Sequence, residues 1–213
     1  MTEQEIKAAA AREDVCRYLA ACFYEPDAAF EEEGMFSALL DAAKQLDASL
    51  GPYAQRLGEQ FRATKIDTLL LDYTRLFLGP MDILAKPYGS VWLDEEKTLM
   101  GESTMAVLEL YREADFEMDE EFKELPDHIA AELEFLYLLI FRENEARQGG
   151  DAAKTAFFID LQQRFLTRHL GAWVGNLASA IKANAQCDFY CELADLASLF
   201  VSQEMTRLKG ISS

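Results

Sequence analysis

Histidine is scarce in this 213-residue chain, in which only His128 and His169 occur. A nucleophilic triad needs a histidine, and His128 with Glu132 at helical spacing would supply only two ligands of a zinc site. None of the 11 glycines stands in a phosphate-binding Gly-Lys-Ser/Thr sequence or in a Gly-x-Ser-x-Gly turn. We therefore expect a protein that is not an enzyme, with no catalytic residue, no metal and no cofactor.

Cysteines and long apolar runs are also few. Cys16, Cys22, Cys187 and Cys191 lack zinc-site spacing and lie in apolar helical contexts, where free cysteine behaves as a small hydrophobic residue. The longest uncharged run, 170–181, is too short to span a bilayer, and the first residues do not form a signal peptide. These features predict a cytoplasmic protein with reduced thiols.

Positive charge is in short supply, because 20 Lys and Arg residues face 38 Asp and Glu residues, a net charge of −18. Between Asp94 and Arg147 there are 17 acidic and 5 basic residues, so this quarter of the chain carries −12. Such a balance argues against nucleic acid and anionic membrane surfaces and favours a basic partner. The alternative is that these acids merely form solvated helix faces.

The apolar residues that are present follow a helical period, and no run alternates as a strand does. Half of the residues are hydrophobic, which is enough for a large core. We predict an all-α fold of nine to ten helices in a compact bundle, in one domain (1–213) with an N-terminal lobe at about 1–120 and a C-terminal lobe at about 125–213. The expected helices cover 6–23, 30–46, a short stretch near 57–61, 65–78, 99–114, 127–147, 151–170, 173–185 and 188–208.

Local signals mark several helix ends. Thr64 and Asp67 have the spacing of a capping box for the helix that begins near residue 65. The segment from 127 to 147 is apolar almost all round, with Leu133 and Leu136 among its residues, and we expect it to be the central buried helix. His169 lies near a helix end, where a cationic side chain would offset the helix dipole.

One segment, at about 81–98, has no helical period and yet is rich in large apolar residues, including Tyr88 and Trp92. It is longer than most connections between helices, and such loops are commonly functional. We expect a packed, irregular loop in which Trp92 contributes to binding. The alternative is a loop whose Trp92 only covers the core.

Several sequence blocks follow one another along the chain. They are Asp72 to Pro80, Pro87 to Asp94, Leu99 to Glu102, Glu124-x-x-Asp127-His128 with the helix that follows, Phe165-x-x-x-His169-Leu170, and Trp173. In their order and spacing these blocks resemble the TorD/DmsD/NarJ family of redox-enzyme maturation chaperones. The Leu-Pro-Asp-His sequence at 125–128 is nearest to the nitrate-reductase branch, which leaves the identity of the client open.

The resemblance implies a TorD-like fold and a cytoplasmic chaperone. Its partner would be the catalytic subunit of a molybdenum oxidoreductase and its twin-arginine leader peptide, held for cofactor insertion before export, with the chaperone a monomer or dimer. The resemblance also implies the peptide-binding residues, namely Glu124, Asp127, His128 and the turn Pro87-Tyr88-Gly89, with Tyr73, Leu76 and Phe77 lining an adjoining apolar pocket.

Two roles are open for the Asp127–His128 pair. In the first, Asp127 accepts hydrogen bonds from the peptide while His128 orients it, and protonation of His128 makes binding sensitive to pH near neutrality. In the second, the pair is structural and caps the helix that it opens. Two other functions also compete with the chaperone reading, a helical scaffold for a basic amphipathic partner and a weak guanine-nucleotide-binding protein.

Overall fold

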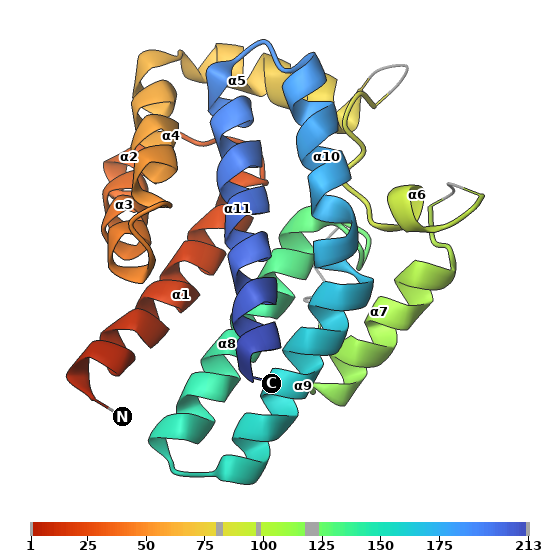
Figure 1. The fold of residues 1–213 in the computed structure, drawn as a ribbon. Helices are drawn as coiled ribbons and strands as arrows, with labels where there is room; N and C mark the ends of the chain where they lie inside the picture. The colour runs from red at the N-terminus through yellow and green to blue at the C-terminus, as the bar shows by residue number, and fades with distance from the viewer. Residues whose placement is uncertain (1, 80–82, 97–98, 118–123, 212–213) are drawn as a thin grey trace.

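The computed structural model describes residues 2–79, 83–96, 99–117 and 124–211, and within them all regular structure is helical (Figure 1). Nine helices have eight residues or more, so the predicted all-α bundle of nine to ten helices is confirmed. The elements are α1 (Glu3–Cys22), α2 (Ala29–Glu32), α3 (Met35–Leu46), α4 (Gly51–Ala63), α5 (Ile66–Tyr73), the π-helical segment η1 (Thr74–Leu78), α6 (Ser90–Leu93), α7 (Glu102–Glu113), α8 (Ile129–Gln148), α9 (Ala152–Arg168), α10 (Leu170–Asn184) and α11 (Asp188–Ile211).

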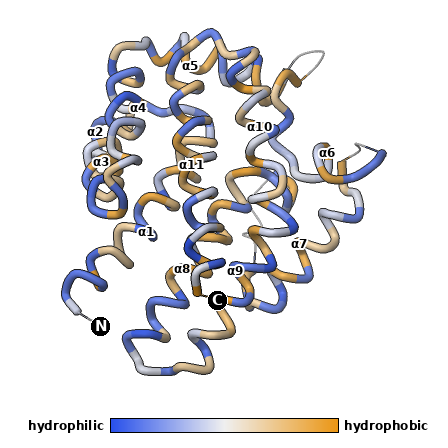
Figure 2. The backbone as a smooth tube through the Cα atoms, viewed as in Figure 1, coloured by the Kyte–Doolittle hydropathy of each residue, from blue (hydrophilic) through white to orange (hydrophobic). Residues whose placement is uncertain are grey.

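The central position predicted for the apolar helix is confirmed. α8 packs against α1 on one side and α9 on another, with α10 also in contact. Leu133 and Leu136 are fully buried, as are side chains on the opposite face such as Phe135. Neighbouring helices thus cover α8 on several faces, as expected for a helix whose first half is almost entirely apolar. Figure 2 shows hydrophobic and hydrophilic residues alternating along the helices of the bundle.

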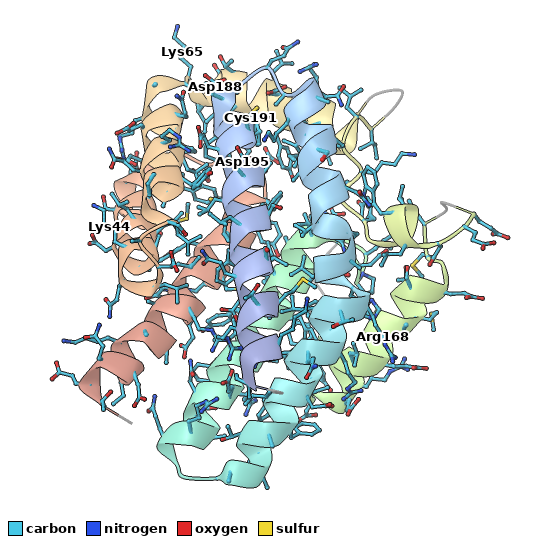
Figure 3. The ribbon with its side chains drawn as sticks, in the orientation of Figure 1. Lys44, Lys65, Arg168, Asp188, Cys191 and Asp195 are labelled. Atoms are coloured by element: carbon cyan, nitrogen blue, oxygen red, sulfur yellow. The ribbon has the colours of Figure 1, made fainter. Side chains whose placement is uncertain are left out.

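Helices from the two predicted lobes pack against each other. α1 packs on both α3 and α8, and α11 packs on both α4 and α10. Figure 3 shows Asp195 on α11, where it accepts a hydrogen bond of 2.7 Å from Lys182 Nζ of α10, one turn from the free thiol of Cys191. The division into lobes stays a prediction, and its boundary near residue 120 lies outside the described residues.

The helix expected at 65–78 differs from the prediction in two ways. Lys65 precedes its first turn and no side chain caps it, so the capping box expected from Thr64 and Asp67 is wrong. At Thr74 the helix widens into the π-helical turn η1, which ends at Gly79, whose φ of 49° suits a residue without a side chain. Such π-helical turns are frequent near functional sites.

The loop expected at about 81–98 is irregular, as predicted, within residues 83–96; residues 81, 82, 97 and 98 lie outside the described parts. Its one regular element is the single turn α6, which packs on α7 and α10. Trp92 is half-buried against the core, and its Nε1 donates a hydrogen bond of 2.9 Å to the carbonyl of Lys86. The loop is therefore packed against the core through Trp92 and against α7 and α10 through α6.

A buried group of charged side chains joins four helices away from the loop. Arg12 of α1 makes two hydrogen bonds to Glu204 of α11, at 2.9 and 2.7 Å, and one to Glu143 of α8 at 3.3 Å. Gln162 of α9 donates to Glu143 at 2.9 Å, and Arg207 donates to Glu204 at 3.2 Å. We call these five residues the ionic cluster. Each of its buried charges lies within reach of an opposite charge.

None of the helices in the described ranges combines the length and the apolar character needed to cross a membrane.

Candidate functional site

The turn Pro87-Tyr88-Gly89 lies directly against the residues that precede α8. Ile129 N donates to the Pro87 carbonyl at 2.8 Å and Gly89 N donates to the Asp127 carbonyl at 2.8 Å, forming an antiparallel bridge between Tyr88 and His128. Residues about 40 positions apart are thus joined through their backbones. This contact brings together the two segments that the sequence singled out.

The side chain of Asp127 caps a different helix from the one that follows it. Its Oδ2 accepts a hydrogen bond of 2.8 Å from Ser90 N, the first residue of α6. The cap of α8 is His128, whose Nδ1 accepts a hydrogen bond of 3.2 Å from Ala130 N. The expectation that α8 begins at Asp127 is therefore corrected, because the helix begins at Ile129.

His128 is buried and electrically neutral. Burial lowers its pKa to about 4, against the attraction of Glu124 and Asp127, and an Nδ1 that accepts a hydrogen bond cannot carry a proton. His128 in this structure therefore does not titrate near neutrality, and the pH-sensitivity of binding stays a prediction. His169 follows the last turn of α9 as predicted, but burial lowers its pKa to about 4 too, so it carries no charge to offset the dipole.

Tyr88 is the half-exposed residue at the tip of this turn. Its hydroxyl donates a hydrogen bond of 2.7 Å to Glu124 Oε2, and its ring packs edge-on against the His128 imidazole with the centroids 5.3 Å apart. Partial burial, followed by the Glu124 carboxylate, raises the pKa of the Tyr88 hydroxyl. Tyr88 therefore presents a fixed, neutral aromatic face beside a carboxylate.

Two residues that the sequence analysis did not assign to this site hold the turn from beneath. A Cβ on Gly89 would lie 3.1 Å from Trp173 Nε1 and 3.3 Å from Glu132 Oε1. Trp173 Nε1 donates a hydrogen bond of 2.9 Å to Glu132 Oε2, and both side chains are fully buried. Gly89 is thus a glycine for lack of space, since its φ of −58° suits any residue. The isolated Glu132 in an apolar helix was the signal that could have revealed this contact.

Several buried polar atoms of the site lack a hydrogen-bond partner among the described residues. Within the described part of the chain, Ser90 Oγ, Asp127 Oδ1 and Glu132 Oε1 are buried and have no hydrogen-bond partner. Burial, together with the nearby Asp127 charge, raises the pKa of Glu132 well above its usual value, so that its carboxyl is neutral. We call Ser90, Asp127, His128, Glu132 and Trp173 the turn cluster. Unsatisfied polar groups of this kind are uncommon in folded proteins and call for an explanation.

The ten predicted peptide-binding residues divide into an accessible and a buried group. Tyr88, Trp92 and Glu124 are partly exposed, whereas the other seven are buried. Tyr73 and Phe77 have ring centroids 5.3 Å apart within the core, and the carbonyl of Leu76 accepts a hydrogen bond of 2.8 Å from Ala85 N in the loop. In this structure they support the loop from the inside, and of the ten residues only Tyr88, Trp92 and Glu124 are accessible from solvent.

A further pair reinforces the Glu124 side of the site. Tyr24, just after α1, donates a hydrogen bond of 2.6 Å to Glu134 Oε1 of α8. Its pKa is raised by burial and also by the charges of Glu134 and Glu124.

No group of three or more potential metal ligands occurs in the residues that the structure describes. The arrangement suits the binding of a ligand with cationic and apolar parts.

Comparison with known proteins identifies the class. The nitrate reductase delta subunit family matches residues 36–179, which run from the first turn of α3 into α10 and include the turn cluster and the Tyr88 turn. The chain belongs to this family. The chain is similar to the Tat proofreading chaperone DmsD of Salmonella typhimurium, with 29% identity over 90% of this chain and 88% of the relative.

Two further proteins are similar to this chain. The chaperone protein TorD of Vibrio parahaemolyticus is 30% identical over 67% of this chain and 65% of its own length. A crystal structure of a protein from Archaeoglobus fulgidus, proposed to act in redox enzyme maturation, aligns with a TM-score of 0.55 at 20% identity, covering 90% of this chain and 93% of that one. At this identity the likeness supports the fold alone, and the predicted TorD-like bundle is confirmed.

Proposed function

We propose that this protein is a cytoplasmic, non-catalytic maturation chaperone that binds the leader peptide, the apo form, or both, of the catalytic subunit of a molybdopterin oxidoreductase. It holds that subunit until its cofactor is inserted and export begins. Membership of a family whose relatives are chaperones supports this role. The single observation that carries it to a site is the Tyr88 turn fixed on the start of α8.

The geometry suggests how the accessible residues divide the work. Tyr88 and Trp92 offer aromatic surfaces to the apolar stretch of a leader, while Glu124 offers a carboxylate to a basic side chain next to that stretch. Burying roughly 300 Å² of apolar surface is worth on the order of 7 kcal/mol before ordering costs. An exposed ion pair contributes about 0.2–1 kcal/mol. The aromatic surface therefore supplies most of the affinity, and the carboxylates supply selectivity and rate of association.

The buried members of the predicted site act through the turn. Asp127, through its bond to Ser90 N, and His128, through its ring contact with Tyr88, fix the position and direction of the Tyr88 side chain. Their backbones complete the bridge to the turn. A ligand that contacts Tyr88 thus depends on residues that it does not touch.

Calorimetric titration with synthetic leader peptides tests the proposal. We expect a leader with an arginine pair and an apolar run to bind at roughly micromolar Kd, about −8 kcal/mol. Replacing both arginines by glutamine should slow association and reduce its salt dependence more than it abolishes binding, because the apolar contact remains. Absence of binding to every leader encoded beside the gene would refute the proposal.

Two single substitutions test whether the leader peptide binds at Tyr88. Tyr88→Ala should weaken leader binding at least tenfold, because it removes the exposed aromatic face. Tyr88→Phe keeps that face and removes only the hydroxyl bonded to Glu124, so it should weaken binding no more than about threefold. Equal behaviour of the two variants would place the peptide elsewhere. A baseline rate of GTP hydrolysis no different from buffer is expected for the same samples.

A further inference from the structure

A groove of about 690 Å³ lies between the α6 turn and the first turns of α7. Its volume falls within the range of roughly 300–1,000 Å³ that is usual for ligand pockets. The described residues that line it are Leu93, Asp94, Glu95, Glu96, Met100, Gly101, Glu102 and Met105.

The apolar part of the groove is unusually exposed. Met100 and Met105 are 57% and 51% exposed, and Leu93, the last residue of α6, also lines the groove. Methionine side chains are flexible and polarizable, so they adapt to ligands of different shape. Large apolar residues that gather in a concave surface commonly mark an interaction site.

The groove also carries a concentrated negative charge. Glu95, Glu96 and Glu102 are exposed, and none of them takes part in the ion pairs found among the described residues, which leave out Lys97. Asp94 differs from them, because its Oδ1 accepts a hydrogen bond of 3.2 Å from Ser103 N and so caps α7. The groove thus exposes three carboxylates to solvent, and the fourth holds its wall in place.

The groove adjoins the proposed peptide site through α6. This single turn carries Trp92 and, as its next residue, Leu93 of the groove wall. Asp127 fixes the first residue of the same turn through its bond to Ser90 N. Trp92 of the proposed peptide site and Leu93 of the groove wall are therefore consecutive residues of one helical turn.

We propose that this groove binds the arginine-bearing segment of the leader peptide, with the guanidinium groups on Glu95, Glu96 and Glu102 and the neighbouring apolar side chains on Met100 and Met105. This inference rests on the proposed function. It separates the leader into two halves, the apolar stretch at Tyr88 and Trp92 and the arginine segment in the groove. The charge of the ligand and the charge of the groove are opposite, and its apolar side chains match the methionines.

The test compares two variants with the same change in total charge. Glu95→Gln/Glu96→Gln/Glu102→Gln removes the groove carboxylates and leaves Asp94, and with it the α7 cap, intact. Glu32→Gln/Glu33→Gln/Asp41→Asn removes three exposed carboxylates on and beside α2 and α3, on the opposite side of the view in Figure 1. Both variants are titrated with the arginine leader and with its glutamine version, at low and at physiological salt.

We expect the groove variant to bind the arginine leader about tenfold more weakly at low salt and the glutamine leader as wild type does. The control variant should change the affinity for either leader less than threefold. If both variants behave alike, the effect belongs to the overall charge and the groove proposal is overturned while the proposed function stands. If wild-type protein binds no leader, the proposed function itself fails, and the groove proposal fails with it.

The methionines provide a second readout that does not depend on charge. Met100→Ser/Met105→Ser should weaken both leaders alike, by about fivefold, because the removed contact is apolar. Ile6→Ser/Phe157→Ser, at exposed apolar positions on α1 and α9, should leave both affinities unchanged. Circular dichroism and Tm confirm that each variant is folded. Unchanged binding by the methionine variant would remove the apolar part of the proposal.

Discussion

The two ends of α8 carry two buried polar clusters that differ in how well their atoms are satisfied. Glu143, near the C-terminal end, belongs to the ionic cluster, where Arg12, Gln162 and Arg207 meet its charge and that of Glu204. Glu132, near the N-terminal end, belongs to the turn cluster, where three buried oxygens of Ser90, Asp127 and Glu132 lack partners in the described chain.

The difference is consistent with the proposed division between a cluster that stabilises the fold and one that supports binding. The ionic cluster joins α1, α8, α9 and α11 with matched donors and acceptors. Beside a half-exposed aromatic turn, the turn cluster holds three buried oxygens that have no hydrogen-bond partner in the described parts of the protein. A buried polar group left unpaired costs about 1–3 kcal/mol, and such costs are more common at binding sites than elsewhere. Four experiments break or sharpen this contrast.

The largest effect is expected in the ionic cluster. Arg12→Met should lower the free energy of unfolding by about 3–5 kcal/mol, because Glu204 and Glu143 remain buried without their main partner. Urea denaturation measures it. Arg17→Met, in an exposed pair with Asp14, is the control and should change stability by no more than about 0.5 kcal/mol. The folded Arg12→Met protein should bind the leader with unchanged affinity. A changed affinity would show that the ionic cluster also affects binding.

Crowding the turn should have the next largest effect. Gly89→Ala places a methyl group against two fully buried side chains, Trp173 and Glu132, and should lower stability by about 1–3 kcal/mol. It should also weaken leader binding at least tenfold, because the Tyr88 turn is displaced. Gly175→Ala, in the exposed interior of α10 with no atom within 4 Å of its new methyl, should instead stabilise by about 0.5–1 kcal/mol. Similar results for the two variants would show that the turn is not tightly held.

The neutral carboxyl of Glu132 predicts a dependence on pH. Its pKa is raised in the folded protein, so its contribution to stability is complete below the unfolded value near 4.5 and is lost as pH rises toward the folded pKa. Glu132→Gln keeps an acceptor for Trp173 and cannot ionise. Its stability relative to wild type should therefore increase by up to about 1.4 kcal/mol per pH unit over that interval. Parallel stability curves from pH 5 to 8 would contradict a neutral Glu132.

The Asp127→Asn variant, which has the smallest expected change in stability, tests whether the charge of Asp127 takes part in binding. Asp127→Asn keeps the oxygen that accepts from Ser90 N and removes the charge, so unfolding should change by no more than about 1 kcal/mol. If the charge of Asp127 reaches the leader, binding should weaken several-fold and lose part of its salt dependence. Binding equal to wild type would make the pair structural. Asp127→Ala, which removes both, shows the size of the structural contribution.

The sequence by itself determined the helical class and the identity of the central helix. Residues from Ile129 to Ile140 are apolar on almost every face, with Glu132 and Glu134 as the two charged exceptions, and such a helix is stable only when neighbours surround it. The lack of any alternating run excluded strands, and the bounds of most long helices were predicted within a few residues. Three boundaries failed. The short helix expected near 57–61 is the 13-residue α4, which begins at Gly51 with Pro52 in its first turn. Backbone geometry decided the other two. Gly34, with φ of 74°, separates α2 from α3, and η1 interrupts the helix that follows Ile66.

The pairing of the turn with α8 could be predicted only from the resemblance, because residues 87–89 and 127–129 are distant in sequence. What the tertiary structure alone decided was which of the predicted residues are reachable and which are charged. Asp127 and His128 look like exposed polar residues in the sequence, yet packing under the Tyr88 turn buries both and removes the charge of His128. The groove likewise exists because α6 and α7 meet there. Burial and concavity depend on contacts between distant segments, and no local pattern encodes them.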